Sequence, residues 1–360
     1  MEKEMYLALE NGEVFKGKSF GAEGGAAGEV VFTTGMVGYL ETLTDPSYCG
    51  QILVQTFPMI GNYGLIPSDF ESQKSYLKAY IVREWCHDPS NFRCEGTIDT
   101  FLKEQGVVGL CGIDTRKLTR ILRENGTMRG CIAQTEEEAK KGLEQKAENS
   151  GVLEATCKHT RIEGSEKAEK TVVILDYGMT HCFSEYLLKR GMRVVIMPAD
   201  SKAETVLSYH PDGILLSNGP GSAQEYPELV AEVAKLSQSG VPIFGIDLGH
   251  LILAAARGGK EQKLKHGHRG ANQPVRRLAT DRVYISSQNH GYTVDMEQLP
   301  ENAKVTFVNL NDGTCEGLEY TDIPAISVQF RPGDGEDKLD TGFLFDQFTN
   351  MMEGKVHAAE

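Results

Sequence analysis

The sequence lacks a long hydrophobic run, a surplus of basic residues and any closely spaced cysteine pair. No apolar stretch approaches the roughly 20 residues that a membrane-spanning helix needs. The net charge of −14 argues against nucleic acid or an anionic membrane surface as the main partner. The eight cysteines are scattered, and their spacing does not suggest a zinc site. Because the chain begins without the basic start and apolar core of a secretory signal, we expect a cytoplasmic protein with reduced thiols.

The length of 360 residues suits two or three domains of roughly 100–200 residues each, and 40% hydrophobic residues suffice for sizeable cores. Residues 1–150 show several short strand patterns and two helix patterns, at 98–105 and 115–124, without regular alternation. Lys and Glu then dominate, and we expect a surface helix followed by a solvated linker at 151–170. This composition predicts an N-terminal mixed α/β domain and a second domain at 171–356.

From residue 171 onward, short apolar strands alternate with helices. This pattern predicts right-handed βαβ units and a doubly wound, mostly parallel sheet, so the fold class is α/β. Ligands of such sheets bind at the carboxyl ends of the strands. Three segments follow predicted strands there: 176–178, 218–221 and 245–249. After residue 258 the sequence predicts short strands at 282–286, 304–309, 315–319 and 324–330, and a last helix at 342–353.

The segment Gly245-Ile246-Asp247-Leu248-Gly249 lies between a predicted strand and a predicted helix. A Gly-x-Xaa-x-Gly pattern in this position is the sequence form of a nucleophile elbow, in which a strained turn exposes the central side chain beside backbone N–H groups. The central residue of such elbows in enzymes is Ser or Cys. Here it is Asp247, so the geometry of an active site is expected without its usual nucleophile.

Several motifs, in this order and spacing, resemble one family over nearly the whole chain. In the first half they are Gly28–Phe32, Thr44–Tyr48 and Gly112–Arg120; in the second they are Ser217–Gly221, the elbow, Gly267–Pro274 and Ser287–Tyr292. The second half resembles a class I glutamine amidotransferase domain. The whole chain resembles the small, glutamine-hydrolysing subunit of carbamoyl-phosphate synthase.

The resemblance implies a catalytic triad that this sequence does not contain. The family uses an elbow Cys as nucleophile and a downstream His-Pro-Glu, whose His is the base and whose Glu orients it. The matching positions here hold Asp247, Arg331 and Gly333, with Pro332 where the Pro of the motif belongs. Arg stays protonated at any ordinary pH, and glycine has no side chain to orient a base. We therefore expect glutaminase activity to be absent.

The same resemblance implies a glutamine pocket and a partner. The positions that match residues holding glutamine in the family are Ser47, Gly219, Gly221, Leu248, Leu251, Asn289, Gly291 and Tyr292, with Leu251 replacing the family's Gln. The expected partner is the large synthetase subunit, in a heterodimer that serves pyrimidine or arginine biosynthesis. ATP is expected on that subunit, so no cofactor and no metal is expected in this chain.

The replacements at the triad lead to one hypothesis and leave alternatives open. Asp247 and Arg331 have opposite charges, so we expect them to form a charge-assisted pair that closes the former site. One alternative is a binding module for glutamine or a similar amino acid. Another is a hydrolase that uses Asp247, with His250 or His290 as the nearby base.

Two further groups of residues suggest chemistry more weakly. His266 and His268 resemble a metal-binding pair, but no carboxylate or third His stands at suitable spacing, so a structural role is favoured. Cys182 follows His181, but adjacent residues on a helix point apart, so Cys182 is interpreted as a buried thiol.

Overall fold

The structure, a computed structural model, describes residues 3–144, 151–299, 302–333 and 341–354. The chain divides into two compact units, Met1–Ser150 and Gly151–Glu360. Each unit has its own strands and two hydrophobic clusters of its own, and each is described by itself below.

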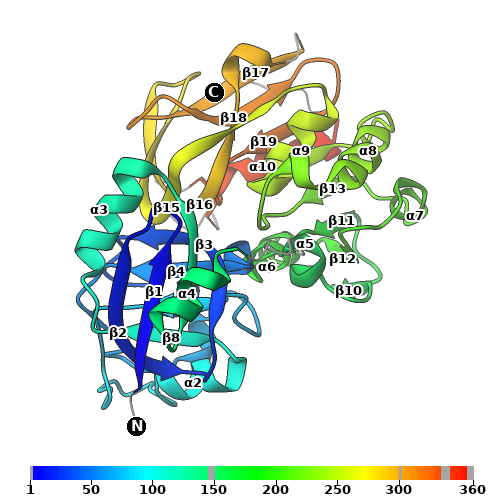
Figure 1. Cartoon of the computed structure of the whole chain (residues 1–360). Helices are drawn as coiled ribbons and strands as arrows, with labels where there is room; N and C mark the ends of the chain where they lie inside the picture. Colours follow the sequence, from blue (N-terminus) through cyan, green and yellow to red (C-terminus); the bar gives the residue numbers. More distant parts are fainter. Residues whose placement is uncertain (1–2, 145–150, 300–301, 334–340, 355–360) are drawn as a thin grey trace. The chain divides into compact units, whose positions relative to one another are not determined.

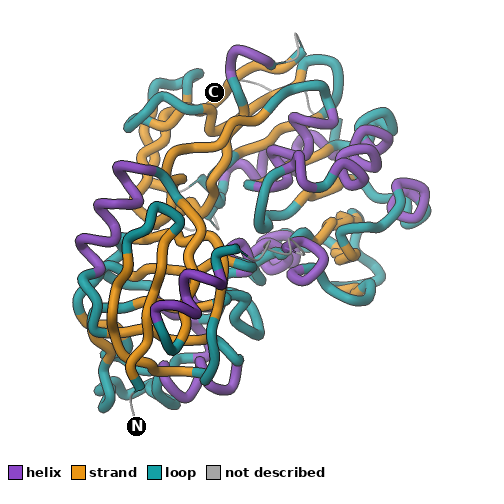
Figure 2. The backbone as a smooth tube through the Cα atoms, viewed as in Figure 1, coloured by secondary structure: helices purple, strands orange, loops and turns teal. Residues whose placement is uncertain are grey.

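The first unit is built on a closed barrel of seven strands (Figures 1 and 2). A hairpin with Asn11-Gly12 in its turn, a common turn pair, joins its first two strands. The order around the barrel is β1 (Glu4–Leu9), β2 (Val14–Gly21), β8 (Val108–Cys111), β6 (Ala79–Ile81), β4 (Gln51–Gln55), β3 (Ala26–Thr33) and β9 (Met128–Ala133). The sequence predicted a mixed, strand-rich domain but not its closure into a barrel.

Short helices and one small strand pair accompany the barrel. The two predicted helices form as α2 (Ile98–Gln105) and α3 (Thr115–Asn125), each with an N-cap side chain that accepts a backbone N–H. The other elements are α1 (Tyr39–Thr44), η1 (Pro46–Tyr48), η2 (Pro67–Asp69), α4 (Glu136–Gly142), and the pair β5 (Met59–Ile60) and β7 (Glu84–Trp85). The expected surface helix is α4, which begins with a capping box at Thr135.

The second unit contains one sheet of ten strands (Figure 1). Its order is β10 (Arg161–Glu163), β12 (Arg193–Pro198), β11 (Thr171–Asp176), β13 (Gly213–Leu216), β14 (Ile243–Ile246), β19 (Ala325–Val328), β18 (Cys315–Tyr320), β17 (Ala303–Asn309), β15 (Glu261–Arg277) and β16 (Arg282–Val294). The five strands from β12 to β19 pair in parallel, which confirms the doubly wound core. The other pairs are antiparallel, so the whole sheet is mixed.

Helices cover both faces of the parallel strands. One face packs against α7 (Ala203–Leu207), α8 (Pro227–Leu236) and α9 (Leu248–Ala256). The other face packs against α6 (Cys182–Lys189) and α10 (Phe343–Met352). Successive residues of β11 alternate between these two cores, as the period of two along a strand requires. The remaining short helices are α5 (Gly151–Ala155), η3 (Ala223–Glu225) and η4 (Met296–Gln298).

Two expectations need correction. Residues 151–170 are not a linker, because Val152 of α5 is fully buried in the core of the second unit and β10 pairs with β12. The charged composition of this segment hid two short elements. The strand β15 was also missed, because its mostly polar sequence shows no apolar alternation. Among the described residues, no helix is long and apolar enough to cross a membrane.

Candidate functional site

The elbow lies between β14 and α9, at the carboxyl end of the parallel sheet. Asp247 is only 2% exposed and adopts φ 54° and ψ −109°, a strained conformation for a residue with a side chain. Its N–H donates to the carbonyl of Val328, 2.9 Å away, and its side-chain Oδ1 accepts from Nε2 of Gln329 at 3.1 Å. The structure therefore contains the strained turn that the sequence predicted, with a carboxylate at its apex.

The two glycines of the elbow are required by close backbone approach. A Cβ atom on Gly249 would lie 2.2 Å from the carbonyl oxygen of Leu216, and one on Gly245 would lie 2.8 Å from the carbonyl oxygen of Gly249. Gly249 also donates its N–H to Ser217 at 3.0 Å. Because no side chain fits at either position, β13, the elbow and α9 are held tightly together.

The other two replaced positions follow the neighbouring strand, β19. Ile246, the residue before Asp247, is in register with Val328, so the chain after each strand emerges at the same edge of the sheet. Arg331 donates its backbone N–H to Ser287 at 2.9 Å, and Gly333 donates its N–H to Oγ1 of Thr341 at 3.1 Å. The topology thus brings Asp247 and Arg331 to one edge, while their ion pair stays a prediction.

Leu248 and Leu251 are buried in the interior, and their contact with a ligand stays a prediction. Their side chains are 1% and 2% exposed and belong to the core on the α8 and α9 face. Leu251, which stands where the family has Gln, therefore adds packing energy to α9 in place of a polar contact. Because the Leu248 side chain is buried in this core, the polar groups that Leu248 can offer to a ligand are those of its backbone.

Gly219 and Gly221 follow β13 at the same edge as the elbow. A Cβ atom on Gly219 would lie 2.4 Å from the carbonyl oxygen of Tyr177, and Gly221 has φ +89°. Both positions need glycine for the course of the backbone alone. Their presence is therefore as well explained by folding as by ligand binding.

Asn289, Gly291 and Tyr292 lie in one segment of β16. Asn289 is in register with Arg269 of β15, and a Cβ atom on Gly291 would lie 3.5 Å from the Arg269 guanidinium. The Lys263 ammonium lies 6.0 Å from the centre of the Tyr292 ring. The structure brings these three residues together, and their contact with a ligand stays a prediction.

Ser47 belongs to the first unit, where it lies in η1. Its backbone N–H donates to Oδ1 of Asp45 at 2.9 Å, and the residue is 5% exposed. Its share in a pocket with residues of the second unit stays a prediction.

The two histidines proposed as bases have partners of their own. Nδ1 of His250 lies 2.8 Å from Oγ of Ser327, and complete burial lowers the pKa of His250 to about 3. Nδ1 of His290 lies 2.8 Å from the Tyr292 carbonyl oxygen, and Nε2 lies 3.1 Å from Oε1 of Gln288. Burial also holds the pKa of His290 well below its usual value. Both rings therefore hold protons weakly at neutral pH.

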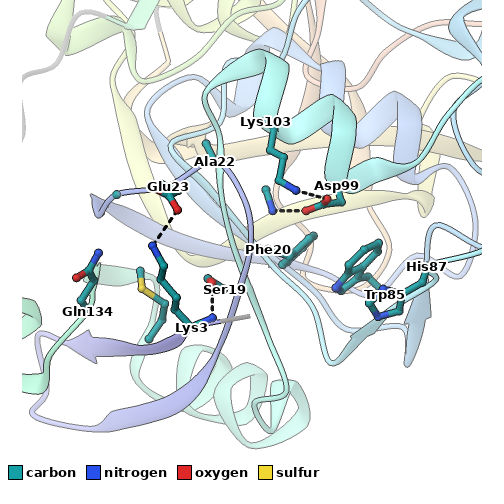
Figure 3. A pocket seen from close by; sticks show the side chains of 13 residues that line it. Lys3, Ser19, Phe20, Ala22, Glu23, Trp85, His87, Asp99, Lys103 and Gln134 are labelled. Atoms are coloured by element: carbon teal, nitrogen blue, oxygen red, sulfur yellow. Dashed lines mark hydrogen bonds and ion pairs between the residues drawn. The ribbon is translucent and has the colours of Figure 1, made fainter. Parts of the chain in front are cut away.

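The first unit has a cavity of about 400 Å³, shown in Figure 3. Charged side chains in its lining pair with one another: Lys3 with Glu23 at 2.8 Å and Lys103 with Asp99 at 2.5 Å. Its full lining is Lys3, Met5, Ser19, Phe20, Gly21, Ala22, Glu23, Gly24, Trp85, His87, Asp99, Lys103 and Gln134. No residue of this cavity was a predicted site residue.

Sequence reasoning missed Gln329, which contacts the elbow carboxylate. It also missed a buried polar cluster around His268, His290 and Glu316, whose members come from three strands. Spacing along the chain gave no signal for either, because the contacts depend on the register of neighbouring strands.

Comparisons with known proteins agree with both halves of this architecture. The family model described as "Carbamoyl-phosphate synthase small chain, CPSase domain" matches residues 7–132, and the model for class I glutamine amidotransferases matches residues 173–351. A carbamoyl phosphate synthase small chain from Clostridium perfringens is 47% identical, over 95% of this chain and 97% of that relative. A pyrimidine-specific small chain from Bacillus subtilis is 44% identical, over 96% of this chain and 95% of that relative.

The second unit therefore has the fold of a class I glutamine amidotransferase, with the elbow at its usual place after a central parallel strand. With the match of the first unit and the full-length relatives, the chain belongs to the family of carbamoyl-phosphate synthase small chains.

Proposed function

We propose that this small chain does not hydrolyse glutamine and acts as a structural or regulatory partner of a large synthetase subunit. The observation that carries the proposal is Asp247 at the apex of the strained elbow. The position keeps the backbone geometry of a nucleophile while the side chain is a carboxylate.

The chemistry of the three replacements supports the loss of activity. A carboxylate is a far weaker nucleophile than a thiolate toward an unactivated amide. The guanidinium of Arg331 cannot accept a proton, and Gly333 cannot orient a base. Loss of the nucleophile or the base alone costs on the order of a million-fold in comparable triads. All three losses together leave no route through the family's acyl-enzyme chemistry.

A hydrolase that uses Asp247 is less well supported. It would need a base near the carboxylate, and the two candidate rings are buried and hydrogen-bonded elsewhere. The pKa of about 3 makes His250 a poor proton acceptor at neutral pH. Turnover that Asp247→Asn abolishes would be the evidence for this alternative.

As a partner, the chain would stabilise the large subunit, cover its ammonia entrance or support synthesis from free ammonia. ATP would bind to the large subunit, and this chain would supply no cofactor. The printed name of its relative from Bacillus subtilis and the net charge of this chain fit a cytoplasmic heterodimer in pyrimidine or arginine biosynthesis.

The test is reconstitution with the large subunit from the same organism. We expect the complex to make carbamoyl phosphate from ammonia, bicarbonate and ATP, and to make none from glutamine. The large subunit alone is the control and should be less active or less stable. Synthesis from glutamine at a rate near that from ammonia would contradict the proposal.

The second candidate is a binding module for glutamine or a similar amino acid. Gly219 and Gly221, which the fold itself requires, are compatible with it because they leave the backbone beside the elbow without side chains. A glutamine-dependent rise in melting temperature of the isolated chain, absent with lysine as the added amino acid, would support it.

A further inference from the structure

A buried cluster of two histidines and a glutamate lies among the antiparallel strands of the second unit. His268 of β15 is directly opposite His290 of β16, and Glu316 comes from β18. The three residues are 6%, 6% and 0% exposed. One potential ligand atom from each lies within 4.8 Å of the other two. The cluster is independent of the replaced triad and of the function proposed above.

The outer nitrogen of each ring is held by a hydrogen-bond acceptor. Nε2 of His268 donates to the carboxylate of Asp312 at 2.8 Å. Nδ1 of His290 donates to the backbone carbonyl of Tyr292, also at 2.8 Å. Histidines that bind metals characteristically donate the other ring N–H to a carboxylate or a backbone carbonyl, because this fixes the ring and the tautomer.

With the outer nitrogens protonated, a neutral ring turns an unprotonated nitrogen toward the centre of the cluster. Nδ1 of His268 lies 3.4 Å from Oε1 of Glu316 and 3.4 Å from Nδ2 of Asn309, an amide group that can only donate. Burial lowers the pKa of His268, but hydrogen bonds to Asp312 and Glu316 outweigh burial and raise this pKa to about 9, so a bound ion would take the place of the proton on Nδ1.

The inner nitrogen of His290 meets an oxygen that also accepts. Nε2 of His290 lies 3.1 Å from Oε1 of Gln288, whose Nε2 donates to Glu316 at 3.0 Å. A neutral His290 that donates from Nδ1 to Tyr292 has no proton left for Gln288, so two lone pairs face each other. A cation beside them would satisfy both atoms.

We propose that Nδ1 of His268, Nε2 of His290 and the carboxylate of Glu316 bind a divalent transition-metal ion such as Zn²⁺. Two imidazoles and one carboxylate are a known ligand set for zinc and for related metals. Bonds of about 2.0–2.2 Å in a tetrahedral site set the ligand atoms about 3.4 Å apart. The pair from His268 and Glu316 already has this spacing, and binding requires Nε2 of His290 to lie equally close to both.

The charges around the site fit a cation. Once an ion replaces the proton on Nδ1 of His268, the carboxylates of Glu316 and Asp312 face one buried guanidinium, that of Arg269, which donates to the carbonyl of His266 at 2.7 Å. The side chain of Asp312 is 41% exposed and contacts Nε2 of His268, so the outer edge of this ring lies near the surface.

The first test uses the full-length chain after treatment with a chelator. Zn²⁺ is then added in excess and the unbound ion is removed by dialysis. We expect one equivalent of Zn²⁺ to remain bound and to raise the melting temperature of the chain. We expect Co²⁺ to give the visible bands of a nitrogen- and oxygen-ligated ion without a thiolate charge-transfer band, which separates this site from binding by cysteines. Less than one equivalent, or a thiolate band, would overturn the proposal.

Variants locate the ion. Glu316→Gln and His290→Gln should weaken Zn²⁺ binding at least about 100-fold, and Asp312→Asn about 10–100-fold. His266→Gln is the matched control, because His266 lies on the same strand outside the cluster and should change binding less than two-fold. Equal binding by all four variants would contradict the assignment. If the buried variants do not fold, the Co²⁺ spectrum of the unaltered chain still decides.

Discussion

The elbow predicts an unusual order of stability for two variants at one position. Asp247 has φ 54° and ψ −109°, a backbone conformation that glycine adopts without strain. In other residues this conformation costs about 1–3 kcal/mol of folding free energy. Asp247→Gly and Asp247→Ala both remove the carboxylate and its bond to Gln329, so they differ only by one Cβ atom. We expect the glycine variant to be more stable than the alanine variant by about 1–3 kcal/mol.

The assay is urea unfolding of the full chain, with the free energy of unfolding compared between the two variants. Ala231→Gly is the control, because Ala231 is exposed in α8 and has ordinary helical neighbours. There glycine should be less stable by about 1 kcal/mol. An alanine variant at 247 that is as stable as the glycine variant, or more stable, would refute the claim that the elbow is a strained turn.

Three further variants test the electrostatics and the packing of the second unit. A backbone N–H and Lys235 lower the pKa of Glu232 from 4.5 to about 2, so its ionised form stabilises the fold above pH 4.5 and this contribution is lost as the pH falls toward 2. Glu232→Gln should therefore cost about 1 kcal/mol at pH 7 and progressively less below pH 4.5, measured by urea unfolding at several pH values. Gly219→Ala should cost about 1–3 kcal/mol in the same assay, because its Cβ would lie 2.4 Å from the Tyr177 carbonyl, whereas Gly291→Ala, with 3.5 Å of clearance, should be nearly neutral. Similar costs for these two glycine variants, or a pH-independent cost for Glu232→Gln, would contradict the respective argument.

The sequence predicted what depends on local patterns. The alternation of apolar strands and helices predicted the parallel core, and the glycine spacing around Asp247 predicted the elbow. The prediction of a linker at 151–170 was wrong, because a short helix and an edge strand can form in a charged segment when one residue, Val152, is buried. The long strand β15 was not predicted, because its residues alternate little in polarity.

At the candidate site, too, the sequence predicted what depends on local motifs and missed what depends on contacts between distant segments. Position in the motif predicted that Asp247 and Arg331 would emerge at one edge of the sheet, and the register of β14 and β19 brings them there. Position did not predict that Leu251 is part of the core or that Gln329 contacts Asp247. Spacing along the chain indicated no carboxylate partner for His268, because His268 and Glu316 lie on different strands and only the fold brings them together.

The central claim is that this family member no longer hydrolyses glutamine. The most direct measurement is ammonia release from glutamine by the chain with its large subunit, compared with the triple variant Asp247→Cys, Arg331→His, Gly333→Glu. The account predicts no release above background by the unaltered chain, and a gain only where the triad is restored. Clear release by the unaltered chain, lost on Asp247→Asn, would contradict the account and show that the carboxylate at the elbow is a working nucleophile.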